Sequence, residues 1–161
     1  MKAIIDSSPL ISMSVINQLE LLEKLLPKVI VPPSVLQEIA RGGDKVESLE
    51  ILDFIQNRIY YPKNEIALGL NLGKGETEAI ALCLELSADL LIVDDKKARN
   101  AAESCNIKCI GTLGLLTLAK KRGFIKELRH YFIQLVEKER YFALELLNDI
   151  LALNEERSIP R

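Results

Sequence analysis

The sequence predicts an α/β fold in which helices cover both faces of a short central parallel sheet. Short apolar segments alternate with longer segments of helical periodicity, which is the pattern of successive strand–helix–strand units. Apolar residues make up 48% of the 161 residues, enough for the core of one domain. Acidic residues directly follow two predicted strands, at the edge where open α/β sheets bind their ligands.

The first predicted elements are two strands separated by two helices. Residues 2–5 are an apolar strand, and the two serines and proline that follow suit a helix start, so we expect a helix at 9–16. Leucines at helical spacing predict a second helix at 19–26, and a proline ends it. The apolar residues 29–31 are too few for a helix and form a buried strand.

Two helices and a third strand candidate come next. Two prolines and a serine start a helix that ends at residues 42–44, which are Gly, Gly and Asp. The helix predicted at 46–56 should turn four apolar residues inward, namely Leu49, Leu52, Phe54 and Ile55. Residues 59–61 are the strand candidate, and an Asn- and Gly-rich connector follows at 62–74.

The second half begins with a buried helix at 75–86 and a buried apolar strand at 90–93. A surface helix is predicted at 96–104, and residues 107–110 form the last strand. Three helices complete the chain, at 113–121, 125–137 and 141–154, and Gly123 ends the first of them. The last residues, 155–161, are expected to be frayed.

Composition and charge narrow the class of protein. Lys and Arg number 21 against 23 Asp and Glu, a net charge of −2 that neither indicates nor excludes nucleic-acid binding. No apolar run reaches the roughly 18 residues of a membrane span, and the N-terminus lacks the features of a signal peptide. We therefore expect a cytoplasmic protein that does not contact the membrane.

Candidate site residues begin with acids at two strands and two helices. Asp6 ends the first strand, and Glu38 lies among apolar neighbours in the helix after the second strand, where an unpaired carboxylate is costly. Glu76 opens the helix at 75–86 on its apolar side, and Glu78 is rotated about 200° from it. We prefer Glu76 as the site residue, with Glu78 as the alternative.

Asp94 and Asp95 close the strand at 90–93 and point in opposite directions if the strand extends that far. We favour Asp94 as the site residue, whereas Asp95 caps the next helix or binds in a second layer. Carboxylates gathered at one sheet edge predict a site for Mg²⁺ or Mn²⁺, which prefer oxygen ligands. Such a cation supports phosphodiester hydrolysis without a His or Ser nucleophile. Lys96, Lys97 and Arg99 either steer an RNA backbone or form a solvated helix face.

Four sequence segments, in this order, carry a resemblance to a known family: IIDSSPLI near the N-terminus, VPPSVLQEI at 31–39, GKGETEAIAL at 73–82 and LLIVDDKKAR at 90–99, with GTLGLLTLAK at 111–120 after them. Together they resemble the PIN domain family of nucleases, which includes the VapC-type toxin ribonucleases. The resemblance covers about residues 1–125 and implies a three-layer α/β/α Rossmann-like fold. The helices at 126–154 either pack on the same domain or mediate self-association.

The resemblance also implies a function and a set of site residues. It implies an endoribonuclease that uses Mg²⁺ or Mn²⁺ to cut single-stranded RNA, with four catalytic acids at Asp6, Glu38, Glu76 and Asp94. Of these, Asp6, Glu76 and Asp94 are expected to bind the metal, and the hydroxyl beside the first acid is that of Ser7 or Ser8. Two positions depart from the family pattern, because Glu76 stands where Asp is usual and Ile92 where Ser or Thr is usual.

Two functional hypotheses follow from this pattern. The first is a metal-dependent ribonuclease that acts as the toxin of a toxin–antitoxin pair. In this role the protein binds an antitoxin protein and forms a homodimer. The second is a PIN-like module without catalysis that binds RNA or protein.

Overall fold

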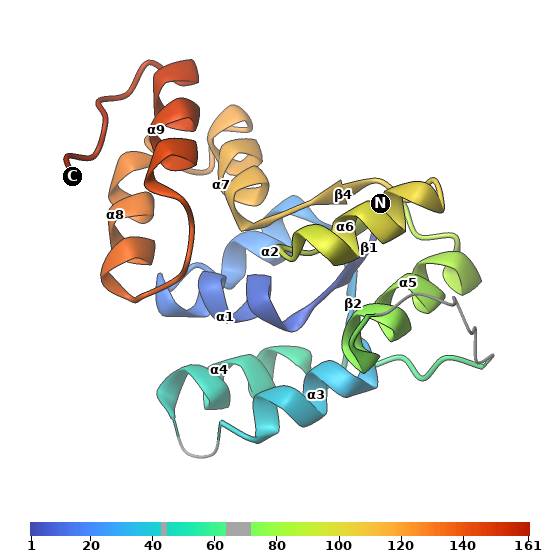
Figure 1. Cartoon of the computed structure of the whole chain (residues 1–161). Coiled ribbons are helices and arrows are strands. Elements are labelled where there is room, and N and C mark those ends of the chain that lie inside the picture. The colour runs from blue at the N-terminus through green and yellow to red at the C-terminus, as the bar shows by residue number, and fades with distance from the viewer. Residues whose placement is uncertain (43–44, 64–71) are drawn as a thin grey trace.

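The computed structural model describes residues 1–42, 45–63 and 72–161. At its centre is a four-stranded parallel sheet (Figure 1), and the strand order is β2-β1-β3-β4. The strands are β1 (Lys2–Ile5), β2 (Lys28–Ile30), β3 (Leu90–Ile92) and β4 (Cys109–Ile110). The predicted α/β class with a short parallel sheet is confirmed.

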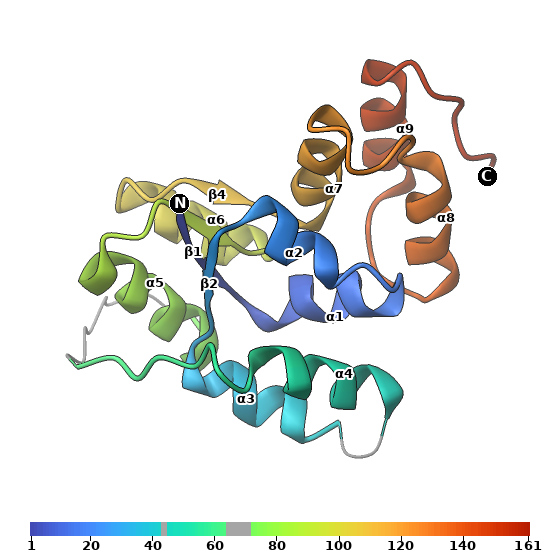
Figure 2. The ribbon, with the colours of Figure 1, turned by 180° about the vertical axis from the view of Figure 1, so that it is seen from behind.

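Helices surround this sheet and occupy nearly every connection between strands. They are α1 (Ser7–Val15), α2 (Glu20–Leu25), α3 (Pro33–Ala40), α4 (Val46–Ile55), α5 (Lys74–Leu86), α6 (Lys96–Ser104), α7 (Thr112–Lys121), α8 (Arg129–Glu137) and α9 (Leu144–Leu153). Figures 1 and 2 show α7, α8 and α9 gathered at one end of the molecule, and α3 and α4 as a pair beside α1. None of the helices in the described part of the chain is long and apolar enough to span a membrane.

The two faces of the sheet contact different helices, because successive side chains of a strand point to opposite faces. Ala3 and Ile5 of β1 belong to the larger apolar cluster, with α1, α2, α3, α4, α7, α8 and α9. Ile4 belongs to the second cluster, with α5 and α6. All three side chains are fully buried. This double coverage explains why the strands are apolar throughout rather than alternating with polar residues.

The strand order fixes the position of the ligand crevice. The chain places β2 on one side of β1 and then crosses to place β3 on the other side. In open α/β sheets, ligands bind outside the carboxyl ends of the strands, where the order reverses. Ile5 pairs with Ile92 at this point, so the residues that follow β1 and β3 emerge next to each other.

Two predicted features of the first half differ from the structure. Residues 59–61 do not form a strand of the sheet, because Ile59 makes only a single bridge to Val31 and Tyr61 is 68% exposed. Leu49 does not face inward; it is 52% exposed, and α4 instead buries Ser48 and Ile51 together with Ile55. Residues 43–44, at the predicted end of the helix after β2, and 64–71 of the predicted connector lie outside the described residues.

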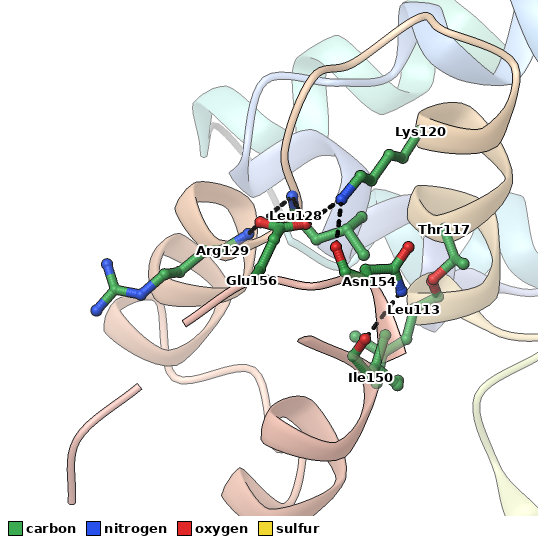
Figure 3. A network of polar contacts seen from close by, with 8 residues as sticks. All are labelled: Leu113, Thr117, Lys120, Leu128, Arg129, Ile150, Asn154 and Glu156. Atoms are coloured by element: carbon green, nitrogen blue, oxygen red, sulfur yellow. Dashed lines mark hydrogen bonds and ion pairs between the residues drawn. The ribbon is translucent and has the colours of Figure 1, made fainter. Parts of the chain in front are cut away.

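The C-terminal tail is not frayed, which corrects the expectation for residues 155–161. The Glu156 carboxylate accepts hydrogen bonds from the backbone N–H groups of Leu128 (2.8 Å) and Arg129 (2.9 Å), and it pairs with the Lys120 ammonium at 2.7 Å (Figure 3). A charge-assisted network of this kind offsets the entropy lost on ordering the tail. It also explains why α8 begins at Arg129 rather than at 125, since the carboxylate accepts the N–H groups of the first turn.

Candidate functional site

Asp6 lies at the centre of the candidate site. It follows β1 directly, its backbone N–H donates to the Ile92 carbonyl of β3 at 3.0 Å, and it occupies the N-cap position of α1. The residue is only 5% exposed. A carboxylate buried to this extent is costly unless it is hydrogen-bonded, protonated or bound to a cation.

The charges around Asp6 come from three other elements. The pKa of Asp6 is raised from 3.8 to about 6, chiefly by burial and in smaller part by the negative charges of Glu76, Glu38 and Asp94. The Ser7 backbone hydrogen bond acts in the opposite direction. These carboxylates reach Asp6 from α5, α3 and the end of β3. Each of these three acids is therefore near enough for its negative charge to act on Asp6 at this edge of the sheet.

Asp94 is the most firmly held of these acids. Its Oδ1 accepts the backbone N–H of Thr112 at 2.7 Å, and its Oδ2 accepts the Thr112 hydroxyl at 2.7 Å and the Ser8 hydroxyl at 3.3 Å. Thr112 is fully buried as the first residue of α7, so both of its donors have fixed directions. The orientation of the Asp94 carboxylate is therefore set by α7 and α1 together.

A close approach of backbone and side chains next to Asp94 requires glycine at position 111. A Cβ atom there would lie 2.7 Å from both Asp94 Oδ1 and Arg99 Nη2, closer than real Cβ contacts. Arg99 also donates from Nη2 to the Val93 carbonyl at 3.1 Å. Its guanidinium therefore lies beside Asp94 rather than on a solvated face, whereas Lys96 and Lys97 are exposed.

The alternative residues of the two acidic pairs have other surroundings. Asp95 is exposed and caps α6, because its Oδ2 accepts the Ala98 N–H at 2.8 Å. Glu78 points one carboxylate oxygen, Oε2, into a buried position where no described residue offers a partner, and its charge is not among those that act on Asp6. Glu38 lies on the exposed side of α3 but within electrostatic reach of Asp6. The assignment of the four acids as catalytic residues remains a prediction.

Ser34 marks the space between α3 and α5. Its hydroxyl oxygen is buried and has no hydrogen-bond partner among the described residues. A Cβ atom at Gly75 would lie 3.5 Å from this oxygen and 3.9 Å from Asp6 Oδ1. A buried polar atom without a partner commonly marks the position of a water or an ion. The glycine, the hydroxyl and the carboxylate thus border one polar space.

These residues fit a hard divalent cation in donor chemistry. All the converging side chains offer oxygen, and a cation would stabilise the ionised form of Asp6, which burial and, to a smaller extent, the nearby negative charges disfavour. Within residues 1–42, 45–63 and 72–161, no three Asp, Glu, His or Cys side chains are close enough to hold one ion together. Mg²⁺ is compatible with this, because it keeps several waters and needs only one or two direct carboxylates.

Sequence reasoning did not identify Thr112 or Ser34 as site residues. The family pattern has a hydroxyl two positions before Asp94, where this chain has Ile92, a fully buried core residue. Thr112 and Ser8 supply hydroxyls to Asp94 instead. Thr112 was detectable in principle, since it follows the last strand at the same sheet edge as the acids.

Comparisons with known proteins agree with the fold. The family model DUF3368, described as a PIN domain, matches residues 2–156. A solved structure, the PilT N-terminus domain protein SSO1118 from the hyperthermophilic archaeon Sulfolobus solfataricus P2, is similar with a TM-score of 0.58 and 24% identity, over 74% of this chain and 93% of that chain. At that identity the likeness establishes the fold alone. No curated protein matches the chain.

The resemblance noted in the sequence is confirmed by the extent of the family match, which includes β1, all the elements of the acidic edge and the C-terminal helices. The chain belongs to the PIN domain family, whose members are generally nucleases.

Proposed function

We propose that this protein is a metal-dependent endoribonuclease that cuts single-stranded RNA. The observation that carries the proposal is the convergence of three carboxylates, from α5, α3 and the end of β3, on a fourth and buried one, that of Asp6. Folding Asp6 into this position works against stability, because burial and like charges both disfavour its ionised form. Such an arrangement is typical of a site that functions with a bound cation.

Asp6 and Asp94 are the residues we expect to hold the cation most directly, with Glu76 as the third ligand. Glu38, on the exposed side of α3, would orient waters around it. When bound, Mg²⁺ or Mn²⁺ makes a coordinated water more acidic and neutralises charge on the phosphate oxygens. Ser8 and Thr112 keep the Asp94 carboxylate in one orientation through their hydrogen bonds.

The exposed Lys96 and Lys97 open α6 directly after Asp94 and Asp95. In the exposed first turn of α6, their ammonium groups would contact the phosphates of a bound RNA strand. This local pair offsets the repulsion that the four carboxylates exert on a polyanion.

The test is cleavage of a mixed single-stranded RNA pool with Mn²⁺, with Mg²⁺ and with EDTA. Wild type is compared with Asp6→Asn and with Asp149→Asn, the same chemical change at an exposed residue of α9. We expect cutting by wild type and Asp149→Asn in Mn²⁺ or Mg²⁺, and none in EDTA or with Asp6→Asn. Cutting that persists in both Asp6→Asn and Asp94→Asn would refute the proposal.

A module that binds RNA or protein without catalysis is the second candidate. The observation that favours it is that the described residues hold no preassembled group of three metal ligands. Calorimetry separates the two functions, because the nuclease binds Mn²⁺ and the module binds RNA without turnover or metal.

We extend the proposal to the role of this ribonuclease in the cell. It would act as the toxin of a toxin–antitoxin pair, bind an antitoxin protein and form a homodimer. A toxin should arrest growth when it is expressed alone, and Asp6→Asn should relieve that arrest. Light scattering of the purified protein tests the dimer independently of activity.

A further inference from the structure

Arg140 connects the C-terminal helices to the acidic site. It follows α8 in the turn before α9, and its guanidinium reaches α1. Its Nε donates to the Ser12 hydroxyl at 3.0 Å, and its Nη2 donates to the Ser8 hydroxyl at 3.0 Å and the Ser8 carbonyl at 3.3 Å. Ser12 is fully buried, and the hydrogen bonds of Arg140 to Ser12 and Ser8 are themselves partly buried.

The Ser8 hydroxyl has Arg140 on one side and Asp94 on the other. A serine hydroxyl has one hydrogen, and its oxygen lone pairs accept hydrogen bonds. Because a guanidinium only donates, the Ser8 oxygen must accept from Arg140 Nη2. Its single hydrogen is then directed at Asp94 Oδ2, 3.3 Å away. Arg140 therefore sets the direction in which Ser8 donates.

The backbone around Arg140 fixes its position. Glu139 adopts a left-handed conformation with φ of 57°. The N–H of Glu139 donates to the Val136 carbonyl at 3.1 Å, and the N–H of Arg140 donates to the Leu135 carbonyl at 2.9 Å. This pair of bonds is a Schellman motif, which ends α8 in a defined geometry. Leu135 is fully buried in the larger apolar cluster, so the turn is anchored to the core.

We infer that Arg140 is a positioning residue of the acidic site and acts on Asp94 through Ser8. The inference rests on the proposed function for its consequence, which is tighter cation binding, but not for the hydrogen-bond relay itself. It gives the turn between α8 and α9 a role in the site, exerted through Ser8. Partners of metal-binding side chains typically change metal affinity or activity by 10- to 100-fold when removed.

The first measurement is Mn²⁺ affinity by calorimetry, for wild type, Arg140→Met, Ser8→Ala and the double variant. Each single change should weaken binding by about tenfold. Because both changes break the same relay, the double variant should also lose only about tenfold. The control is Arg129→Met, since the guanidinium of Arg129 contacts the Ser158 carbonyl away from the acids and its removal should leave the affinity unchanged.

The second measurement needs no metal and no activity. It is the hydrogen-exchange rate of the Thr112 amide, which donates to Asp94 Oδ1. We expect faster exchange in Arg140→Met and Ser8→Ala, with the amide of Leu116 in the same helix unchanged. Should Arg140→Met fail to fold, Arg140→Lys replaces it, because lysine lacks the planar fork with which Arg140 contacts Ser12 from Nε and Ser8 from Nη2.

The outcomes separate the relay from the proposed function. An unchanged Thr112 exchange rate in Arg140→Met would overturn the relay, as would a double variant about a hundredfold weaker than wild type. If wild type binds no Mn²⁺, the proposed nuclease function fails, and the exchange rates alone decide whether Arg140 positions Asp94.

Discussion

Replacing Asp6 with Asn should make the protein more stable while removing its activity. Asp6 is 5% exposed, and burial together with the nearby carboxylates raises its pKa from 3.8 to about 6. The folded protein therefore holds this proton more tightly than the unfolded chain does. The resulting loss of stability is absent below about pH 4, grows as the pH rises, and is complete above about pH 6 to 7.

The size of the effect follows from the shift. A shift of about 2 pKa units at about 1.4 kcal/mol per unit corresponds to about 3 kcal/mol at pH 7.5. At pH 5 the ionised fraction of the folded state is small, and the same linkage leaves about 1.5 kcal/mol. Asn keeps a buried polar group in place, so the gain in unfolding free energy should lie between about 1.5 and 3 kcal/mol at pH 7.5.

The assay is urea unfolding at pH 5 and pH 7.5 for wild type, Asp6→Asn and Asp149→Asn. Asp6→Asn should be more stable at both values, with the larger gain at pH 7.5, whereas the exposed Asp149→Asn should match wild type. Mn²⁺ at about 100 times its dissociation constant should then add about 2.7 kcal/mol to wild type and less to Asp6→Asn. The reasoning is refuted if Asp6→Asn is no more stable than wild type at pH 7.5, or if its gain does not change with pH.

Three further changes test other parts of the site and fold. Thr112→Val removes the hydroxyl hydrogen bond to Asp94 and should lower the RNA cleavage rate by about tenfold, whereas Thr112→Ser keeps the hydroxyl and should keep the rate. Equal rates for the two variants would contradict this role of Thr112. Gly75→Ala should raise the unfolding free energy by about 0.5–1 kcal/mol, since the added Cβ makes only ordinary van der Waals contacts. The same Cβ enters the polar space beside Ser34 and Asp6, so the variant should bind Mn²⁺ more weakly. An unchanged Mn²⁺ affinity in calorimetry would argue against a cation in that space. Glu156→Gln should lower the free energy of unfolding by about 1–3 kcal/mol at pH 7, because hydrogen bonds from Lys120 and the α8 backbone hold the pKa of Glu156 below its ordinary value of 4.5. The difference from wild type in urea unfolding should vanish as the pH falls through that lowered pKa. A difference that does not depend on pH would count against the charged network.

Predicting the sheet from sequence worked because its strands are buried on both faces. Residues such as Ile4 and Leu91 belong to uninterrupted apolar segments, and parallel strands covered by helices require that composition. The failed strand at 59–61 has similar composition. Its composition did not show that only Ile59 would pair with the sheet, through a single bridge to Val31. Strand pairing there depends on where β2 ends.

Helix ends depended on partners far away in the chain. The helix predicted from residue 125 begins at Arg129 because the Glu156 carboxylate accepts the N–H groups there, and no local signal marks that contact. The tail was expected to fray for the same reason, since its charged residues gave no indication of a cationic partner at Lys120. Local patterns report propensity, and here a tertiary contact decided the boundary.

For the acids, position along the chain was informative and orientation was not. Asp94 and Asp95 were both expected at the sheet edge, and which one faces Thr112 depends on where β3 ends. By itself the sequence determined the α/β class, the parallel sheet and the edge at which the acids gather, because burial and strand direction follow from local composition. Only the tertiary structure brought Thr112 and Arg140 to Asp94 and Ser8, because those contacts depend on how separate elements pack against each other.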